Sequence, residues 1–248
     1  MNKLEKNLIT FLFLFTIVLA STSILVSGTQ KFQPIFSVDR EDKSISLTFD
    51  INWAENDSLI SILDVLDKYN VKGTFFLMGR WINYSEENIE KLKEINKRGH
   101  EIANHSYIHP MFTKISPEKM TEEIKKTEDI IYEHTGVKTK LFRCPSGDYN
   151  DAVIKTVEGI GYKTIQWDVD SVDWKEVGQE TEYKKVINNV KSGSIILFHN
   201  NAKYTPKNLP LIIENLTKKG YKFLKIGDLI YRENFTIDNN GVQKKIKY

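Results

Sequence analysis

Apolar and polar positions alternate along the chain with two different periods. Short apolar runs of strand length recur between Ser44 and Lys225, and the longer stretches between them carry apolar residues at helical spacing. Asp57–Tyr69 is an example of this spacing, because Leu59, Ile62, Leu63 and Leu66 would lie on one face of a helix. Asp57 stands where the N-cap of such a helix is expected.

The two periods alternate in a regular order. The predicted strands are Ser44–Phe49, Gly73–Leu77, His100–Ala103, Lys140–Phe142, Lys163–Trp167, Ser194–Phe198 and Tyr221–Lys225. The predicted helices are Asp57–Tyr69, Ser85–Arg98, Pro117–Thr135, Asn150–Gly159, Thr181–Lys191 and Pro206–Lys219. About seven strand–helix units in succession indicate a parallel sheet, open or closed into a barrel. In such folds the loops that follow the strands carry the chemistry.

The N-terminal apolar pattern is longer and predicts export. Lys3 and Lys6 precede Leu8–Val26, a nearly unbroken apolar run, and a positive flank before such a run directs export. The run is roughly as long as the ~20 residues that span a bilayer. It is interpreted as a cleaved signal peptide or an uncleaved anchor, and the lack of a convincing small-x-small cleavage site favours the anchor. Either interpretation places the folded domain outside the cytoplasm, secreted or held at the outer face of the membrane.

The predicted organisation is a signal peptide or signal anchor at 1–28, a linker at 29–42, one folded domain at 43–233 and a tail at 234–248. A net charge of +2 and a pI of about 8.3 are too mild to indicate nucleic acid binding. Cys144 is the only cysteine, so the chain cannot form an internal disulfide. No feature of the sequence indicates a protein partner.

Ionisable residues follow the first predicted strands directly. Asp50 comes at the end of Ser44–Phe49. His105 and His109 follow the third strand at a spacing that lets two imidazoles meet one metal ion. Pro110 disfavours a helical conformation at His109, so the pair is expected on a short turn that enters a loop.

Later strands end in the same way. Arg143 follows Lys140–Phe142, and a guanidinium there can hold a carboxylate in its ionised form. Asp170–Trp174 offers two carboxylates beside an aromatic ring, and His199 ends the last buried run. Because all these groups fall on loops at strand ends, we expect them to meet at one site.

In order and spacing, these groups resemble the motifs of the polysaccharide deacetylase family, carbohydrate esterase family 4, whose shared unit is the NodB homology domain. The resemblance covers roughly Lys43–Tyr231, with motif matches at Thr48–Asp50, His105–His109, Arg143–Gly147, Asp170–Trp174 and Leu197–His199. The opening Phe49–Trp53 is most similar to that of the sporulation-type deacetylases of spore-forming bacteria.

The resemblance implies a distorted (β/α) barrel of about seven parallel strands. It implies a hydrolase that removes N-acetyl groups from N-acetylglucosamine-type residues of a cell-wall glycan, peptidoglycan or a similar polysaccharide. It also implies a divalent metal, Zn²⁺ with Co²⁺ or another divalent ion as alternatives, held by His105 and His109.

The family pattern further assigns roles to single residues. Asp50 would act as general base, oriented by Arg143, and His199, paired with Asp173, as general acid. A backbone N–H near Ser146 would stabilise the oxyanion. The side chains of Trp174 and Leu197 would enclose the acetyl methyl group of the substrate.

Ile51 departs from the family pattern, which has a metal-ligating Asp at this position. Catalytic zinc sites usually have three protein ligands, so Asn52, Glu55, Asp57 or water must complete the shell. Asp57 is preferred, because the helix that it begins lies at the same barrel mouth, although a role as helix cap suits it equally. The departure leaves open a non-catalytic glycan-binding wall protein that has lost the metal. An O-acetyl esterase acting on xylan, which shares the catalytic residues, is a further alternative.

Overall fold

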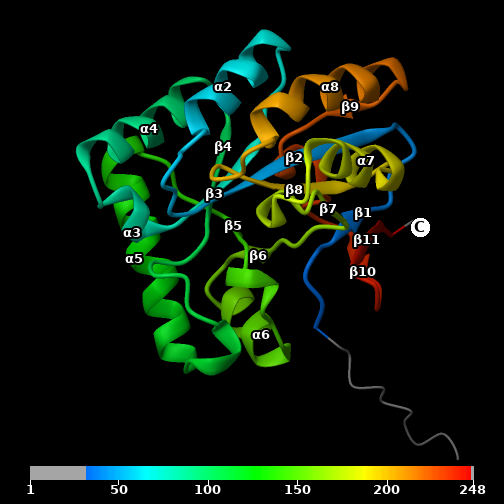
Figure 1. Ribbon diagram of the computed structural model, residues 1–248. Helices are drawn as coiled ribbons and strands as arrows, with labels where there is room; N and C mark the ends of the chain where they lie inside the picture. Colours follow the sequence, from blue (N-terminus) through cyan, green and yellow to red (C-terminus); the bar gives the residue numbers. More distant parts are fainter. Residues whose placement is uncertain (1–31, 247–248) are drawn as a thin grey trace, which may run out of the picture. The chain divides into compact units, whose positions relative to one another are not determined.

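The computed structural model of the protein describes residues 32–246. Its main feature is a sheet with the strand order β6-β5-β4-β3-β2-β8-β7, to which β9 is added by pairing with β2. Every neighbouring pair in this sheet is parallel. In Figure 1 the helices α2, α4, α5 and α8 lie around the outside of these strands. The pairing begins at β6 and ends at β7, so the prediction of a distorted barrel of about seven parallel strands is confirmed as a half-barrel.

The bounds of the elements agree closely with the two periods of the sequence. The strands of the main sheet are β2 (Ser44–Ile51), β3 (Thr74–Leu77), β4 (Glu101–Asn104), β5 (Leu141–Phe142), β6 (Lys163–Thr164), β7 (Val169–Asp170), β8 (Ile195–His199) and β9 (Lys222–Phe223). The helices are α2 (Leu59–Lys68), α3 (Gly79–Ile82), α4 (Glu86–Lys97), α5 (Pro117–Thr135), α6 (Asp151–Gly159), α7 (Gln179–Asn189), α8 (Thr205–Lys218) and α9 (Ile226–Leu229).

Strand β2 is an inner strand of the sheet: all eight of its residues are buried, and it pairs with β3, β8 and β9. Its apolar residues alternate with polar ones, so one face carries Ile45, Leu47, Phe49 and Ile51 and the other carries the small polar residues and Asp50. Phe49 stacks on Phe75 of β3 and on Phe198 of β8, with ring centroids 4.8 and 5.7 Å apart. This packing helps to fix the register of β2 and β8, whose ends carry Asp50 and His199.

Local capping explains where the helices start. Ser116 accepts a hydrogen bond from the backbone N–H of Lys119 at the start of α5, and Pro117 takes the first helical position. At α2 the expected cap is displaced by one residue: Ser58 is the N-cap, and Asp57 Oδ1 accepts the N–H of Leu59 at 2.9 Å.

The expected linker and tail differ from the structure. Within them, β1 (Ser37–Val38), β10 (Phe235–Ile237) and β11 (Val242–Lys245) form a second sheet in the order β1-β11-β10. It is joined to the main sheet by the Val38 N–H, which donates to the Gly193 carbonyl at 3.0 Å. Strands this short carry no readable period, so the sequence pattern did not reveal them.

The predicted signal peptide or anchor at 1–28 lies outside the described residues. Within residues 32–246, no helix combines the length and the apolar character that crossing a membrane requires.

Candidate active site

Asp50 and Arg143 form a buried ion pair at the ends of β2 and β5. Arg143 Nη1 donates to Asp50 Oδ1 at 2.7 Å, and Nη2 donates to the Gln166 carbonyl at 3.1 Å. Burial alone would favour the neutral carboxyl, but the charge and hydrogen bond of Arg143 outweigh it and hold the pKa of Asp50 below its ordinary value. Asp50 is therefore a carboxylate at neutral pH, able to accept a proton.

His105 faces this carboxylate from the end of β4. Its Nε2 lies 3.5 Å from Asp50 Oδ2, and its Nδ1 lies 2.9 Å from the Arg143 carbonyl oxygen. The carbonyl can only accept, so Nδ1 carries the proton and the Nε2 lone pair is left toward Asp50. Burial lowers the pKa of His105 to about 4. A neutral imidazole with its second nitrogen bonded to a carbonyl is typical of a metal ligand.

His109 completes the histidine pair by a tight turn. Its ring centroid lies 4.9 Å from that of His105, and burial lowers its pKa. Positive φ angles of 68° at Ser106 and 61° at His109 confirm the expected turn. Glu123 of α5 holds this turn, because its Oε2 accepts the N–H groups of Tyr107 and Ile108 at 3.0 and 2.8 Å. The helical pattern of 117–135 gave no signal for that role of Glu123.

His199 stands at the end of β8, directly opposite Asp50 in the strand register. Its Nδ1 lies 2.7 Å from Asp173 Oδ1, and its backbone N–H donates to Asp173 Oδ2 at 2.7 Å. Burial opposes the charged imidazole, but the hydrogen bond and charge of Asp173 outweigh it and raise the pKa of His199. His199 can therefore carry a proton to higher pH than an ordinary histidine.

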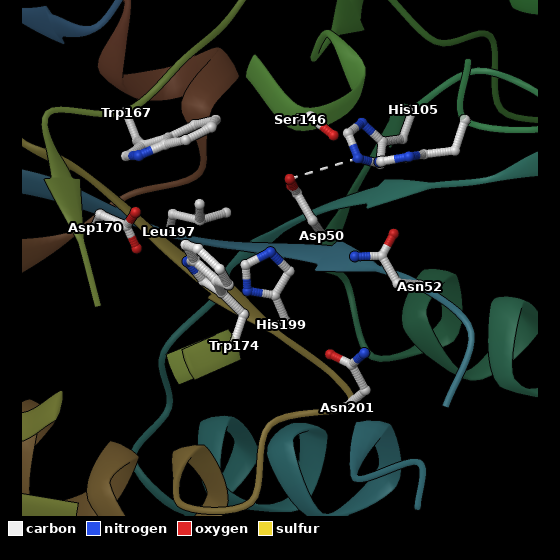
Figure 2. Close-up of a pocket in the computed structure, with 11 residues that line it drawn as sticks. Asp50, Asn52, His105, Ser146, Trp167, Asp170, Trp174, Leu197, His199 and Asn201 are labelled. Atoms are coloured by element: carbon white, nitrogen blue, oxygen red, sulfur yellow. Dashed lines mark ion pairs between the residues drawn. The ribbon is translucent and has the colours of Figure 1, made fainter. Parts of the chain in front are cut away.

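The predicted residues, except Asp57, meet around one cavity of about 310 Å³. Figure 2 shows Asp50 between His105 and His199, with Trp167, Trp174 and Leu197 at the end away from His105. The cavity is lined by Asp50, Asn52, His105, His109, Ser146, Trp167, Asp170, Trp174, Leu197, His199 and Asn201. Arg143 and Asp173 bond to Asp50 and His199 without lining the cavity. The shared site expected from the strand ends is thus formed.

Two lining residues were not singled out from the sequence: Trp167, which ends the predicted strand Lys163–Trp167, and Asn201, which lies two residues beyond β8. Asp170, one of the two carboxylates expected at the site, lines the cavity from the end of β7. The rule that strand ends carry the site applies to both Trp167 and Asn201 and would have found them. Trp167 also flanks Arg143, with the guanidinium carbon 5.4 Å from its ring.

Asp57, the preferred third metal ligand, is not brought to the cavity. Its Oδ1 accepts from Asn200 Nδ2 at 3.0 Å, and its Oδ2 pairs with Lys91 Nζ at 3.0 Å. With Glu55 it lines a separate cavity of about 330 Å³. The expectation is corrected for a physical reason: the carboxylate is already committed to a helix start, an amide and an ammonium group.

The residues present fit a metal ion through two imidazoles and leave the third place without an acidic side chain. Ile51 is fully buried in the apolar core, on the opposite face of β2 from Asp50 by the alternation of a strand. Within the described part of the chain, no group of three or more His, Cys, Asp and Glu is arranged to hold a metal. Of the three alternatives to Ile51, Asn52 alone lines the cavity with the histidines.

The fold and cavity together define an α/β half-barrel that gathers acid–base residues at the ends of parallel strands. The chain belongs to the polysaccharide deacetylase family, whose profile matches residues 37–165. It is 32% identical over 198 residues to YlxY of Bacillus subtilis, covering 80% of this chain and 60% of that protein. It is 32% identical over 217 residues to the peptidoglycan-N-acetylmuramic acid deacetylase PdaA of Bacillus subtilis, covering 86% and 81%.

Solved structures agree with this assignment. PdaA superposes with a TM-score of 0.73 at 31% identity, over 79% of this chain and 84% of that one. BA3943 of Bacillus anthracis, described as a carbohydrate esterase family 4 pseudoenzyme, superposes with a TM-score of 0.74 at 34% identity, over 79% and 68%. A mutant of BA3943 is described as having restored enzymatic activity. The family therefore includes both active and inactive members similar to this chain.

Proposed function

We propose that the protein is a metal-dependent polysaccharide deacetylase that removes N-acetyl groups from N-acetylglucosamine-type residues of peptidoglycan or a similar wall glycan. One observation carries the proposal: Asp50, whose pKa is lowered, and His199, whose pKa is raised, occupy opposed register positions on β2 and β8 and face one cavity. Amide hydrolysis needs such a pair, because a base must activate water and an acid must protonate the departing amine. The similarity to PdaA, a peptidoglycan-N-acetylmuramic acid deacetylase, supports peptidoglycan as the substrate.

His105 and His109 are the residues that would hold the ion, Zn²⁺ or Co²⁺, with the Asn52 amide or water in the third place. A divalent ion bound there supplies a Lewis acid that polarises the acetamide carbonyl and lowers the pKa of water. Asp50 takes the proton of the attacking water while Arg143 fixes the orientation of its carboxylate.

The other side of the cavity handles the leaving group. His199 gives its Nε2 proton to the departing amine, and Asp173 keeps the opposite ring nitrogen, Nδ1, in its donor form. The backbone N–H near Ser146 stabilises the developing oxyanion. Trp174 and Leu197 enclose the acetyl methyl group at the end of the cavity.

Acetate release from defined substrates tests the proposal. The purified chain, loaded with Zn²⁺ or Co²⁺, is incubated with peptidoglycan, chitooligosaccharides and acetylated xylan, with and without a chelator. We expect release from the N-acetylated glycans, loss of release on chelation and recovery on adding the metal. Release from xylan alone would instead identify an O-acetyl esterase, and no release from any substrate would reject the enzyme.

A second candidate function is a glycan-binding wall protein without turnover. Ile51 in place of a ligating Asp and the similarity to BA3943, described as a pseudoenzyme, favour it. It requires glycan binding that is equal with and without metal, measured by calorimetry with chitooligosaccharides. The complete set of Asp50, Arg143, Asp173 and His199 favours catalysis, because glycan binding alone needs none of their charge pairing.

We also propose that the protein acts outside the cytoplasmic membrane, where peptidoglycan lies, and that 1–28 is its signal peptide or anchor. A role in sporulation is part of the proposal, because Phe49–Trp53 is similar to the corresponding segment of sporulation-type deacetylases. External protease added to intact protoplasts should degrade an anchored form, and the culture medium should contain a cleaved one. Protection of the chain in intact protoplasts would reject export.

A further inference from the structure

A second buried carboxyl group lies behind His199. Glu182 is on α7, which packs against α8 (Figure 1), and only 1% of its surface is exposed. Its Oε1 accepts the hydroxyl of Thr205 at 3.2 Å. Its Oε2 has no hydrogen-bond partner among the described residues, and the same holds for the buried Oδ1 of Asn208. Buried oxygens without a donor are costly, so this arrangement calls for an explanation.

Thr205 connects Glu182 to the acid side of the cavity. Its hydroxyl lies 2.9 Å from Asp173 Oδ2 as well as 3.2 Å from Glu182 Oε1. Asp173 in turn holds His199 Nδ1 at 2.7 Å. A hydroxyl has a single proton to donate, so it cannot fully serve two carboxylates at once. A proton on Glu182 resolves the conflict, because Glu182 then donates and Thr205 is free to donate to Asp173.

Burial and the nearby charge of Asp173 favour the protonated form of Glu182. Burial raises the pKa of Glu182 to about 7, the charge of Asp173 raises it as well, and the hydrogen bond of Thr205 acts against them. The turn after β7 contributes Asp173 and β8 contributes His199, while α8 contributes only the neutral Thr205 and Asn208. On α7 itself, Glu180 pairs with Lys184 at 2.7 Å on the exposed face.

We propose that Glu182 and Thr205 are positioning residues that hold Asp173, and through it His199, in the geometry of a general acid. The inference rests on the proposed function for its chemistry. Neither residue lines the cavity, so neither contacts the substrate. Their effect passes through the hydrogen bonds of Thr205 and, when Glu182 is ionised, through its charge beside Asp173. Ionisation of Glu182 would compete for the Thr205 proton and add negative charge beside Asp173.

Four variants test this inference. Glu182→Gln removes the ionisable group at nearly constant volume, Thr205→Val removes the bridging hydroxyl, and Thr205→Ser keeps it. Glu180→Gln is the matched control, because it removes one carboxylate from the same helix at a side chain that is 78% exposed. Thermal unfolding confirms that each variant folds.

Two readouts separate positioning from a merely structural role. NMR titration of the His199 ring, assigned with His199→Gln, reports its pKa in the full chain without any need for turnover. In Glu182→Gln the pKa of His199 should fall and the alkaline limb of kcat should move to lower pH, because Glu182 carries a negative charge only above its pKa of about 7 and the variant carries none there. In Thr205→Val, kcat should fall roughly tenfold with KM unchanged, the effect of one hydrogen bond to a charged group, and Thr205→Ser should restore it.

The outcomes distinguish this inference from the proposed function. If the chain releases no acetate, a lowered pKa of His199 in Glu182→Gln still supports the connection, and the enzyme proposal falls alone. If acetate is released but His199 titrates identically in Glu182→Gln, Glu180→Gln and the unmodified chain, the role of Glu182 is rejected. Equal kcat in Thr205→Val and Thr205→Ser rejects the role of Thr205.

Discussion

On the β8 side of the cavity, each group behind His199 is hydrogen-bonded to the next, from Asp173 to Thr205. On the side formed by β2 and β4, the Arg143 carbonyl orients His105 equally well. The residue after Asp50 on this side is Ile51, which packs in the apolar core. The acid side of the cavity, formed by His199, Asp173 and Thr205, is therefore complete in this chain. The metal side, formed by His105 and His109, lacks an acidic third ligand.

The difference has a structural cause as well as a chemical one. Strand β2 continues through Ile51, which pairs with Leu77 of β3. Because side chains alternate along a strand, the residue after Asp50 points away from the cavity and into the core. Asn52, the next residue, points back to the cavity wall. A ligand in this chain is thus to be sought at Asn52, one position later than in the family motif.

The largest effect should come from breaking the acid side. His199→Gln removes the proton donor for the leaving amine, and we expect kcat to fall by about 10²–10⁴-fold. The unmodified enzyme should lose activity at high pH only above the ordinary histidine range, because Asp173 raises the pKa of His199. Acetate release measured across pH checks both expectations.

His134→Gln is the control for that variant, because His134 lies in the last turn of α5, outside the cavity. Its pH profile should match that of the unmodified chain. Full activity in His199→Gln would contradict the assignment of the acid.

The next effect is on stability and concerns Asp50. Arg143→Met leaves a buried carboxylate without its partner, which we expect to cost about 3–5 kcal/mol of unfolding free energy. The pH dependence should also change sign. In the unmodified chain the pKa of Asp50 is lowered on folding, so its stabilisation is present above the unfolded value of about 3.9 and is lost as the pH falls through the folded value.

In Arg143→Met the burial of Asp50 is no longer offset, so its folded pKa should rise above the unfolded one. Acidification toward pH 4 should then stabilise the variant relative to pH 7. Denaturant unfolding at the two pH values measures this. Equal losses at both pH values would show that Arg143 contributes packing against Phe76, 4.0 Å away, rather than charge.

A pair of variants sharpens the metal side. Asn52→Asp should raise affinity for Zn²⁺, because it adds a carboxylate on the wall that holds His105 and His109. Ile51→Asp should leave affinity unchanged and lower stability by about 2–5 kcal/mol, because it buries a polar group in the core. Calorimetric zinc titration and denaturant unfolding check the two. A gain in affinity in Ile51→Asp would contradict the strand alternation.

The sequence predicted the long segments, in which the hydrophobic pattern repeats several times and the ends are marked by capping residues. Helix α5 begins and ends at the predicted Pro117 and Thr135, because an N-cap serine, a first-turn proline and Gly136 mark both ends. The convergence of Asp50, His105 and His199 followed from their places at strand ends. These signals are local, so one chain is enough to read them.

What the sequence could not give depends on contacts between distant segments. Strand β7 is two residues long and is defined only by its pairing with β8. The bridge from Glu182 to Asp173 joins α7 to a turn through Thr205 of α8, and no spacing in the chain encodes it. Asp57 was ambiguous for the same reason, since a carboxylate before a helix suits a cap and a ligand equally until its partners are known.

The smallest effect separates those two roles of Asp57. Asp57→Ala removes the hydrogen bond to the Leu59 N–H and the ion pair with Lys91, and we expect a loss of about 1–2 kcal/mol of unfolding free energy. Zinc affinity and kcat should stay unchanged, because the carboxylate lies outside the cavity. Lys91→Met breaks the ion pair but keeps the hydrogen bond at the helix start, so it should cost less than Asp57→Ala. A drop in zinc affinity in Asp57→Ala but not in Lys91→Met would show that Asp57 is a metal ligand after all.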